Sequence, residues 1–307
     1  MVEMIRLEHA TRRFGATVAV DDLSFSVHSG EMFGLIGPDG AGKTTTIRLI
    51  CGLLAADAGR VRVHGLDPVR EHRAVTASVG YLSQRFSLYG DLTVDENIAF
   101  FAEIHGVPDY RQRRDRLLAL TQLSAFRSRL AERLSGGMKQ KLALACTLVH
   151  EPALIVLDEP TTGVDPVSRR EFWKLLSDFL SQGITVVMAT PYLDEAERCS
   201  RVALLHEGGL LALDDPASLR AALPGSILEV VVDDHRHAAA VLASVPGVEQ
   251  VQMFGERAHV RVARADDDVR AALAIALGGA GLNVREIRPI AASLEDVFIA
   301  KLEEARS

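Results

Sequence analysis

The sequence has few cysteines, no long apolar run and no excess of positive charge. Its three cysteines, Cys51, Cys146 and Cys199, stand singly without a C-x-x-C pair, so we expect buried thiols and neither a disulfide nor a metal site. No apolar stretch approaches the ~20 residues that a membrane-spanning helix needs, and the first residues lack the basic-then-apolar layout of a signal peptide. The formal net charge of -7 argues against a nucleic-acid partner, whose phosphates attract a basic face. These absences predict a globular protein of the cytoplasm.

The length of 307 residues and the 48% share of hydrophobic residues allow about two domains with substantial cores. A break near Leu223 to Ser226, with a proline and a glycine, predicts a first domain at residues 1–224 and a second at 225–307. The basic run from Arg111 to Arg116 lies in a segment of helical periodicity, and we interpret it as a solvated helix face.

A short apolar run followed by a glycine-rich loop organises the first domain. Met32 to Ile36 predicts a buried strand. Directly after it comes the pattern G-x-x-x-x-G-K-T, followed by Thr45 and made of Gly37, Pro38, Asp39, Gly40, Ala41, Gly42, Lys43 and Thr44. Such a loop aims backbone N–H groups at a phosphate, and the helix that begins near Lys43 adds the positive end of its dipole. Lys43 can reach the β- and γ-phosphates, and the Thr44 hydroxyl can bind Mg²⁺. The alternative, a glycine-rich turn without a ligand, is disfavoured because strand, loop, lysine and hydroxyl coincide.

Two adjacent acidic residues end another predicted strand. The continuous apolar run Ala153 to Leu157 predicts a strand buried on both faces, with Asp158 and Glu159 at its carboxyl end. Beside a phosphate loop, Asp158 can hold Mg²⁺ through water and Glu159 can polarise an attacking water. The alternative is a pair of acidic residues at a loop entrance.

Residues 91–150 change to a helical pattern, which predicts a helical insertion within an α/β sheet protein. The insertion closes with Ser135, Gly136 and Gly137 before an apolar helix. Ser135 is a good N-cap, and the two glycines expose N–H groups at a helix N-terminus, where an anion can bind. Such a triplet on its own is usually only a cap. Phe14, in a turn near Gly15, either stacks on a purine or packs as an ordinary aromatic.

The second domain shows the element order βαββαβ, the split βαβ arrangement of ferredoxin-like domains, with an added helix capped by Ser293. The fold class expected for the whole chain is therefore an α/β P-loop domain with a helical insertion, plus a small α+β domain. Trp173, the only tryptophan, is expected in helix packing.

Taken in order, these motifs resemble the ATP-binding subunit of ABC transporters over about Met4 to Ala222. The resemblance rests on Phe14, the loop Gly37 to Thr44, Gln84, the signature LSGGMKQ at Leu134 to Gln140, the strand ending at Asp158 with Glu159, and Asp165. It implies that two such domains close head to tail around two ATP molecules. Ser135, Gly136, Gly137 and Gln140 of one subunit would then face the nucleotide held by Lys43 of the other.

The resemblance also implies individual roles. Phe14 would stack on adenine, Gln84 would contact Mg²⁺ and sense the membrane partner, Glu159 would be the general base and Asp165 would lie at the nucleotide interface. The segment Arg85 to Glu96 would form the groove for a permease helix. The implied cofactors are ATP and Mg²⁺, the implied partners are an integral-membrane permease and a second ATP-binding subunit, identical or different, and the implied location is the inner face of the cell membrane.

The ending from Ser293 to Phe298 is similar to the C-terminal extension of ATPases that pair with ABC-2 type permeases, the exporters of drugs, lipids and polysaccharides. We therefore expect an ABC-2 exporter subunit. One alternative is a soluble ABC ATPase acting on ribosomes or DNA, which the charge and the lack of a second ATPase domain or long coiled coil disfavour. Another is a nucleotide-gated partner that hydrolyses almost nothing; the intact Glu159 argues against it and Pro191 argues for it.

The chain departs from the family pattern at two positions. Pro191 stands where the family usually has a histidine that contacts the γ-phosphate, and proline has neither a side-chain donor nor a backbone N–H. Asp39 stands where the family more often has Asn or Ser, and we expect it to point away from the phosphates. Both features resemble the first half of tandem ATPases that serve ABC-2 multidrug exporters. Our hypothesis is slow hydrolysis beside a second, complete ATPase domain, unless a neighbour such as Thr190 or Tyr192 replaces the histidine.

Overall fold

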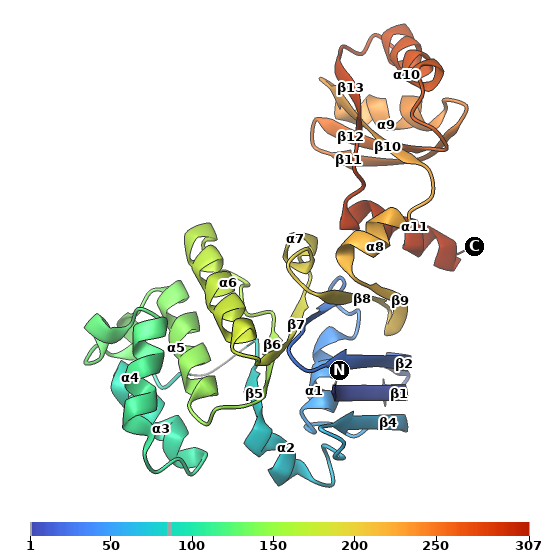
Figure 1. Ribbon diagram of the computed structural model, residues 1–307. Coiled ribbons are helices and arrows are strands. Elements are labelled where there is room, and N and C mark those ends of the chain that lie inside the picture. Colours follow the sequence, from blue (N-terminus) through green and yellow to red (C-terminus); the bar gives the residue numbers. More distant parts are fainter. Residues whose placement is uncertain (1, 85–87, 307) are drawn as a thin grey trace. The chain divides into compact units, whose positions relative to one another are not determined.

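The computed structural model describes residues 2–84 and 88–306 in two compact units, Met1–Leu213 and Asp214–Ser307. The first unit contains a six-stranded and a three-stranded sheet, and the second contains a four-stranded sheet (Figure 1). Among the described residues, every helix is too short or too polar to span a bilayer.

The six-stranded sheet has the order β5-β6-β7-β3-β8-β9. The neighbouring pairs among its first five strands, β5, β6, β7, β3 and β8, are all parallel. The strands are β3 (Met32–Ile36), β5 (Val79–Leu82), β6 (Leu154–Asp158), β7 (Thr185–Thr190), β8 (Arg201–His206) and β9 (Gly209–Asp214). Every residue of β3, β6 and β7 is buried, which explains their continuous apolar runs. Because the carboxyl ends of parallel strands meet at one edge, the loops after these three strands lie together.

The three-stranded sheet has the order β2-β1-β4 and is antiparallel, with β1 (Glu3–Phe14), β2 (Thr17–His28) and β4 (Ala58–Val63). Helix α1 (Lys43–Ile50) packs against strands of both sheets, and Phe25 of β2 stacks on Phe33 of β3 with ring centres 5.2 Å apart. For β1 and β2, the pattern of apolar residues in the sequence predicts the shorter strands Met4 to His9 and Leu23 to Val27. The prediction was too short because pairing continues through several bulges, where polar residues face solvent, to a turn at Gly15 with φ +59°.

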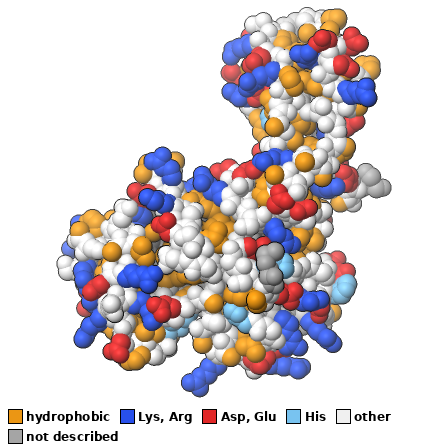
Figure 2. Space-filling view, viewed as in Figure 1, with side chains coloured by type: hydrophobic (Ala, Val, Ile, Leu, Met, Phe, Trp, Pro, Cys, Tyr) orange, Lys and Arg blue, Asp and Glu red, His pale blue; other side chains and the backbone are white. Residues whose placement is uncertain are grey.

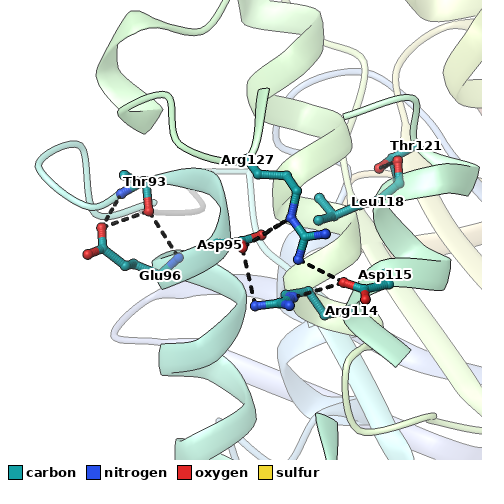
Figure 3. A network of polar contacts seen from close by, with 8 residues as sticks. All are labelled: Thr93, Asp95, Glu96, Arg114, Asp115, Leu118, Thr121 and Arg127. Carbon is teal, nitrogen blue, oxygen red and sulfur yellow. Dashed lines mark hydrogen bonds and ion pairs between the residues drawn. The ribbon is translucent and has the colours of Figure 1, made fainter. Parts of the chain in front are cut away.

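The predicted helical insertion is confirmed as α3 (Val94–Ile104), α4 (Tyr110–Leu120) and α5 (Gly136–Leu148), with the short turns η1 (Ser124–Phe126) and η2 (Ala131–Arg133). The remaining helices of the first unit are α2 (His72–Ser78), α6 (Pro166–Ser181) and α7 (Leu193–Ala196). A capping box between Thr93 and Glu96 begins α3. Beside it, Asp95 accepts from Arg127 and pairs with Arg114, and Arg127 also bonds Asp115, so one ionic network joins α3, α4 and the segment after η1 (Figure 3).

The interpretation of the basic run as a solvated face is wrong for two of its arginines. The side chains of Arg113 and Arg114 are only 26% and 16% exposed. Arg113 donates to the carbonyl oxygen of Val149 at 2.6 Å, at the C-terminal end of α5, where a helix attracts a cation. On the face of the molecule in Figure 2, basic and acidic side chains are interspersed, as on an ordinary solvated surface.

A fully buried amide, Asn97, fixes the loop before α3. Its Nδ2 donates to the carbonyl oxygens of Tyr89 and Thr93 at 3.0 and 2.9 Å, and its Oδ1 accepts from Tyr89 N at 3.0 Å. We expect Asn97→Ala to lower the free energy of unfolding by about 3 kcal/mol, because it leaves buried backbone groups without partners and opens a small cavity. Urea denaturation measures this loss, with Glu103→Ala on the exposed side of α3 as the matched control. Equal midpoints for both variants would contradict the role of Asn97.

The predicted burial of the cysteines and the tryptophan is confirmed. Cys51, Cys146 and Cys199 are buried free thiols. Burial raises the pKa of Cys51 and Cys199 to about 12, so these thiols stay protonated at neutral pH. Trp173 is buried in α6.

The second unit is a four-stranded antiparallel sheet with the order β11-β12-β10-β13. Its elements are α8 (Pro216–Ala221), β10 (Ser226–Val232), α9 (His235–Ala243), β11 (Val248–Phe254), β12 (Arg257–Val262), α10 (Asp267–Gly279), β13 (Val284–Ile290) and α11 (Leu294–Arg306). The strand order β11-β12-β10-β13 is that of a ferredoxin-like fold, as predicted. The predicted cap of the added helix is also present, because Ser293 Oγ accepts from Asp296 N at 3.2 Å at the start of α11. The unit begins at Asp214, earlier than the predicted boundary after Pro224, because α8 packs against α11.

Candidate functional site

The glycine-rich loop between β3 and α1 is closely packed on its surroundings. A Cβ on Gly37 would lie 2.2 Å from the carbonyl oxygen of Leu205, and a Cβ on Gly42 would lie 2.4 Å from that of Ala19. Gly42 also has φ +93° at the N-cap of α1, a conformation that side-chain-bearing residues rarely adopt. The loop therefore leads through Gly42 directly into the N-terminus of α1, where the positive end of the helix dipole favours an anion.

Lys43 provides a buried positive charge at this loop. Its side chain is 4% exposed, and Nζ donates to the carbonyl oxygens of Gly37 and Pro38 at 2.8 and 3.0 Å. Nζ also lies 3.6 Å from Oε1 of Glu159. A buried ammonium group needs partners of this kind, and a bound phosphate can take their place.

The acidic pair at the end of β6 meets the loop as predicted. Thr44 Oγ1 donates to Asp158 Oδ1 at 3.0 Å, and burial raises the pKa of the Asp158 carboxyl above its ordinary value. Glu159 has φ +50°, a conformation that residues with side chains seldom adopt and that is concentrated at functional sites. Its Oε2 accepts from Gln84 Nε2 at 2.9 Å. Thr44 and Asp158 thus bring side-chain oxygen atoms together, and Gln84 is bonded to the neighbouring Glu159. Oxygen ligands of this kind fit a Mg²⁺ ion, and a cation beside them would offset the cost of the buried carboxylate.

One cavity combines these groups. Its lining residues come from the loop, from β2, from the ends of β6 and β7 and from Gln84: Thr17, Val18, Ala19, Asp39, Gly40, Ala41, Gly42, Lys43, Thr44, Thr45, Gln84, Glu159, Thr162, Pro191 and Tyr192. Seven of the residues predicted to bind nucleotide, from Asp39 to Thr45, are therefore brought together, and Pro191 lines the same cavity.

The sequence did not predict that Thr17, Val18 and Ala19 line the cavity. They follow the β1–β2 turn, which strands β2 and β3 separate from the phosphate loop in the chain, and the available signal was Phe14 beside this turn. Phe14 pairs with Thr17 across that turn and is 46% exposed, with the Arg12 guanidinium 4.9 Å from its ring centre. Its stacking on adenine stays a prediction.

The signature residues lie at the N-terminus of α5. Ser135 caps this helix through a bond from Met138 N at 3.3 Å, and Gly136 and Gln140 line a second cavity together with Gln84 and Val164. Gly137 packs against α6, where a Cβ would overlap the Ser168 side chain.

Asp165 caps α6. Its Oδ1 accepts from the N–H groups of Val167 and Ser168 at 3.1 and 3.0 Å. Hydrogen bonds from the side chain and then the backbone of Ser168 are the main reasons that the pKa of Asp165 is lowered. The predicted permease groove from Arg85 to Glu96 begins in residues 85–87, which lie outside the described part of the chain.

The comparisons with known proteins agree with this site. Residues 20–162 match the family described as "ABC transporter", and residues 215–302 match the C-terminal domain of ATP-binding proteins like DrrA1-3. The chain is 40% identical to the probable multidrug ABC transporter ATP-binding protein YbhF of Escherichia coli over 92% of its own length, but it spans only 48% of that relative. It is 35% identical to the daunorubicin resistance ATP-binding protein DrrA2 of Streptomyces coeruleorubidus, over 96% of this chain and 94% of the relative.

A solved structure is similar as well. It is a dimeric ATP-binding cassette in a post-hydrolysis state with bound ADP and phosphate, 25% identical, with a TM-score of 0.62 over 69% of this chain and 98% of that chain. The similarity to DrrA2 spans nearly the whole of both chains, and the phosphate loop, acidic pair and signature helix are in place. The chain belongs to the ATP-binding proteins of the ABC transporter family.

Proposed function

We propose that this chain is the ATP-binding and ATP-hydrolysing subunit of an ABC-2 type membrane exporter. The observation that carries the proposal is the cavity lined by the buried Lys43, by Thr44 and by Glu159, with Asp158 bonded to the Thr44 hydroxyl. Bound Mg²⁺ would neutralise phosphate charge there, held by Thr44, Asp158 and Gln84. Lys43 would bind the β- and γ-phosphates, and Glu159 would accept a proton from the attacking water.

The exporter class is supported by the second unit. Its sequence matches the DrrA1-3-like C-terminal domain, and the relatives over the whole chain carry names of multidrug and daunorubicin resistance proteins. The partners we propose are an ABC-2 permease, which would hold the chain at the inner face of the membrane, and a second ATP-binding subunit. The dimeric state of the related cassette supports a second subunit facing Ser135 and Gly136.

Slow hydrolysis is the second part of the proposal. Pro191 lines the cavity but has no hydrogen-bond donor. The neighbouring Thr190 does not supply the missing donor, because its hydroxyl is buried and donates to Glu195 Oε2 at 2.7 Å. A slow site of this kind would work beside a second, complete ATPase domain, and the dimeric state of the related cassette supports such a pairing.

The test is ATP binding by wild type and Lys43→Ala. We expect the substitution to weaken ATP binding about tenfold to hundredfold, because it removes a charge-assisted contact worth about 1.5–3 kcal/mol. Titration calorimetry with Mg-ATP measures the affinity, and Lys174→Ala on the exposed face of α6 is the control. Unchanged affinity in Lys43→Ala would contradict the assignment of this cavity to ATP.

A further inference from the structure

A buried carboxylate, Glu195 of α7, lies behind the strand end that carries Pro191. It is 1% exposed, and its two oxygens have separate partners. Oε1 accepts from Thr161 Oγ1 at 2.5 Å, and Oε2 accepts from Thr190 Oγ1 at 2.7 Å. Burying a carboxylate costs free energy unless it is well bonded, so loss of either hydroxyl partner would destabilise the buried Glu195.

The partners of Glu195 belong to different parts of the nucleotide site. Thr161 lies in the loop that follows Glu159, whereas Thr190 ends β7 directly before Pro191. Arg169, in the first half of α6, places Nε 3.7 Å from Glu195 Oε1. The carboxylate therefore links the loop after the general base, the helix capped by Asp165 and the strand end beside the cavity.

The link extends to the backbone of the cavity wall. Tyr192 N donates to Thr190 Oγ1 at 3.1 Å, so the hydroxyl of Thr190 accepts from Tyr192 while it donates to Glu195. The Arg169 guanidinium also lies 5.0 Å from the Tyr192 ring centre. Because Pro191 and Tyr192 line the cavity together with Glu159, the position of this wall relative to Glu159 depends on the carboxylate behind it.

We propose that Glu195 is a positioning residue for ATP hydrolysis. Through Thr190 and Thr161 it fixes the position of Pro191 and Tyr192, in the cavity wall, relative to the loop that contains Glu159. The proposal rests on the proposed function. Pro191 has no donor that could bond to phosphate or water, so it can affect the site only through its position. The contacts of Glu195 with Thr190 and Thr161, which fix that position, are therefore important in this chain.

The experiment compares Thr190→Val with Thr190→Ser. Valine keeps the shape and suits a buried strand but removes the hydroxyl, whereas serine keeps the hydroxyl. We expect Thr190→Val to lower kcat for Mg-ATP about tenfold with KM within about twofold of wild type, since a small misplacement of a catalytic site affects the chemical step more than binding. Thr190→Ser should restore at least half of the wild-type kcat. Each variant is measured alone and on a Pro191→His background, so that slow turnover by wild type does not hide the effect.

A second readout needs no turnover. Thr190→Val removes the acceptor of the Tyr192 amide, so hydrogen exchange in the peptide containing residues 190–196 should become at least tenfold faster than in Thr190→Ser. If Thr190→Val is unstable at the assay temperature, Thr161→Val removes the other hydroxyl bonded to Glu195 and must show the same fall in kcat.

The outcomes separate the two proposals. Normal ATP binding with equal kcat and equal exchange in the valine and serine variants overturns the role of Glu195 and leaves the proposed function standing. A rise in KM with unchanged kcat also overturns it. Absence of ATP binding by the wild type overturns the proposed function itself, and the exchange experiment then decides alone whether Glu195 holds the Tyr192 backbone.

Discussion

Glu159→Gln lowers the rate constant for hydrolysis of bound Mg-ATP by about 10²–10⁴-fold, the usual contribution of a positioned general base. The substitution keeps the shape of the side chain and one acceptor oxygen near Lys43 Nζ, which lies 3.6 Å from Glu159 Oε1. It removes the basic group that takes the proton from water. Single-turnover release of phosphate measures the rate constant even where steady-state turnover is slow.

The same variant should retain ATP affinity within a few-fold and accumulate an ATP-bound dimer, because closure around ATP no longer ends in hydrolysis. Light scattering with and without Mg-ATP reports the dimer. Glu103→Gln on α3 serves as the control for loss of one negative charge. Equal single-turnover rates in wild type and Glu159→Gln would show that another group accepts the proton.

The phosphate loop and the acidic pair could be predicted because each follows a fully buried strand. A parallel sheet places the carboxyl ends of such strands at one edge, so Thr44 and Asp158 meet although they are distant in sequence, with their side chains 3.0 Å apart. The order of elements in the second unit was predictable because short runs rich in β-branched residues are separated by segments of helical periodicity or by turn residues.

Other features depend on pairings that local sequence does not encode. The length of β1 and β2 comes from cross-strand bonds through bulges, so residues Thr17 to Ala19 were not expected in the cavity wall. The network of Glu195 was also missed, because an acidic residue in a short helix normally faces solvent. Its burial follows from hydroxyl groups on a loop and a strand that only the fold brings to it.

A gain of ATPase activity in Pro191→His would distinguish two possibilities. Either the wild-type site hydrolyses ATP slowly because it lacks the histidine, or another residue has taken over the role of the histidine. Pro191→His should raise the rate of Mg-ATP hydrolysis about 10²–10³-fold, the typical value of one donor aimed at a transition-state oxygen. The imidazole would enter the wall that Pro191 and Tyr192 form beside Glu159, where the backbone ends of β6 and β7 are already tied by Glu159 N donating to Ala189 O at 2.9 Å.

The control for this gain is Pro191→Ala, which removes the proline ring without adding a side-chain donor. Because only the histidine variant supplies the donor, the alanine variant should stay near wild type, and the double variant Pro191→His with Glu159→Gln should be inactive. If wild type already hydrolyses ATP as fast as Pro191→His, then a group such as Tyr192, which also lines the cavity, orients the water, and a symmetric pair of this chain is sufficient as a motor. A slow wild type restored by histidine instead requires a complementary ATPase domain, since closure of two weak sites would hydrolyse too little ATP to drive repeated transport.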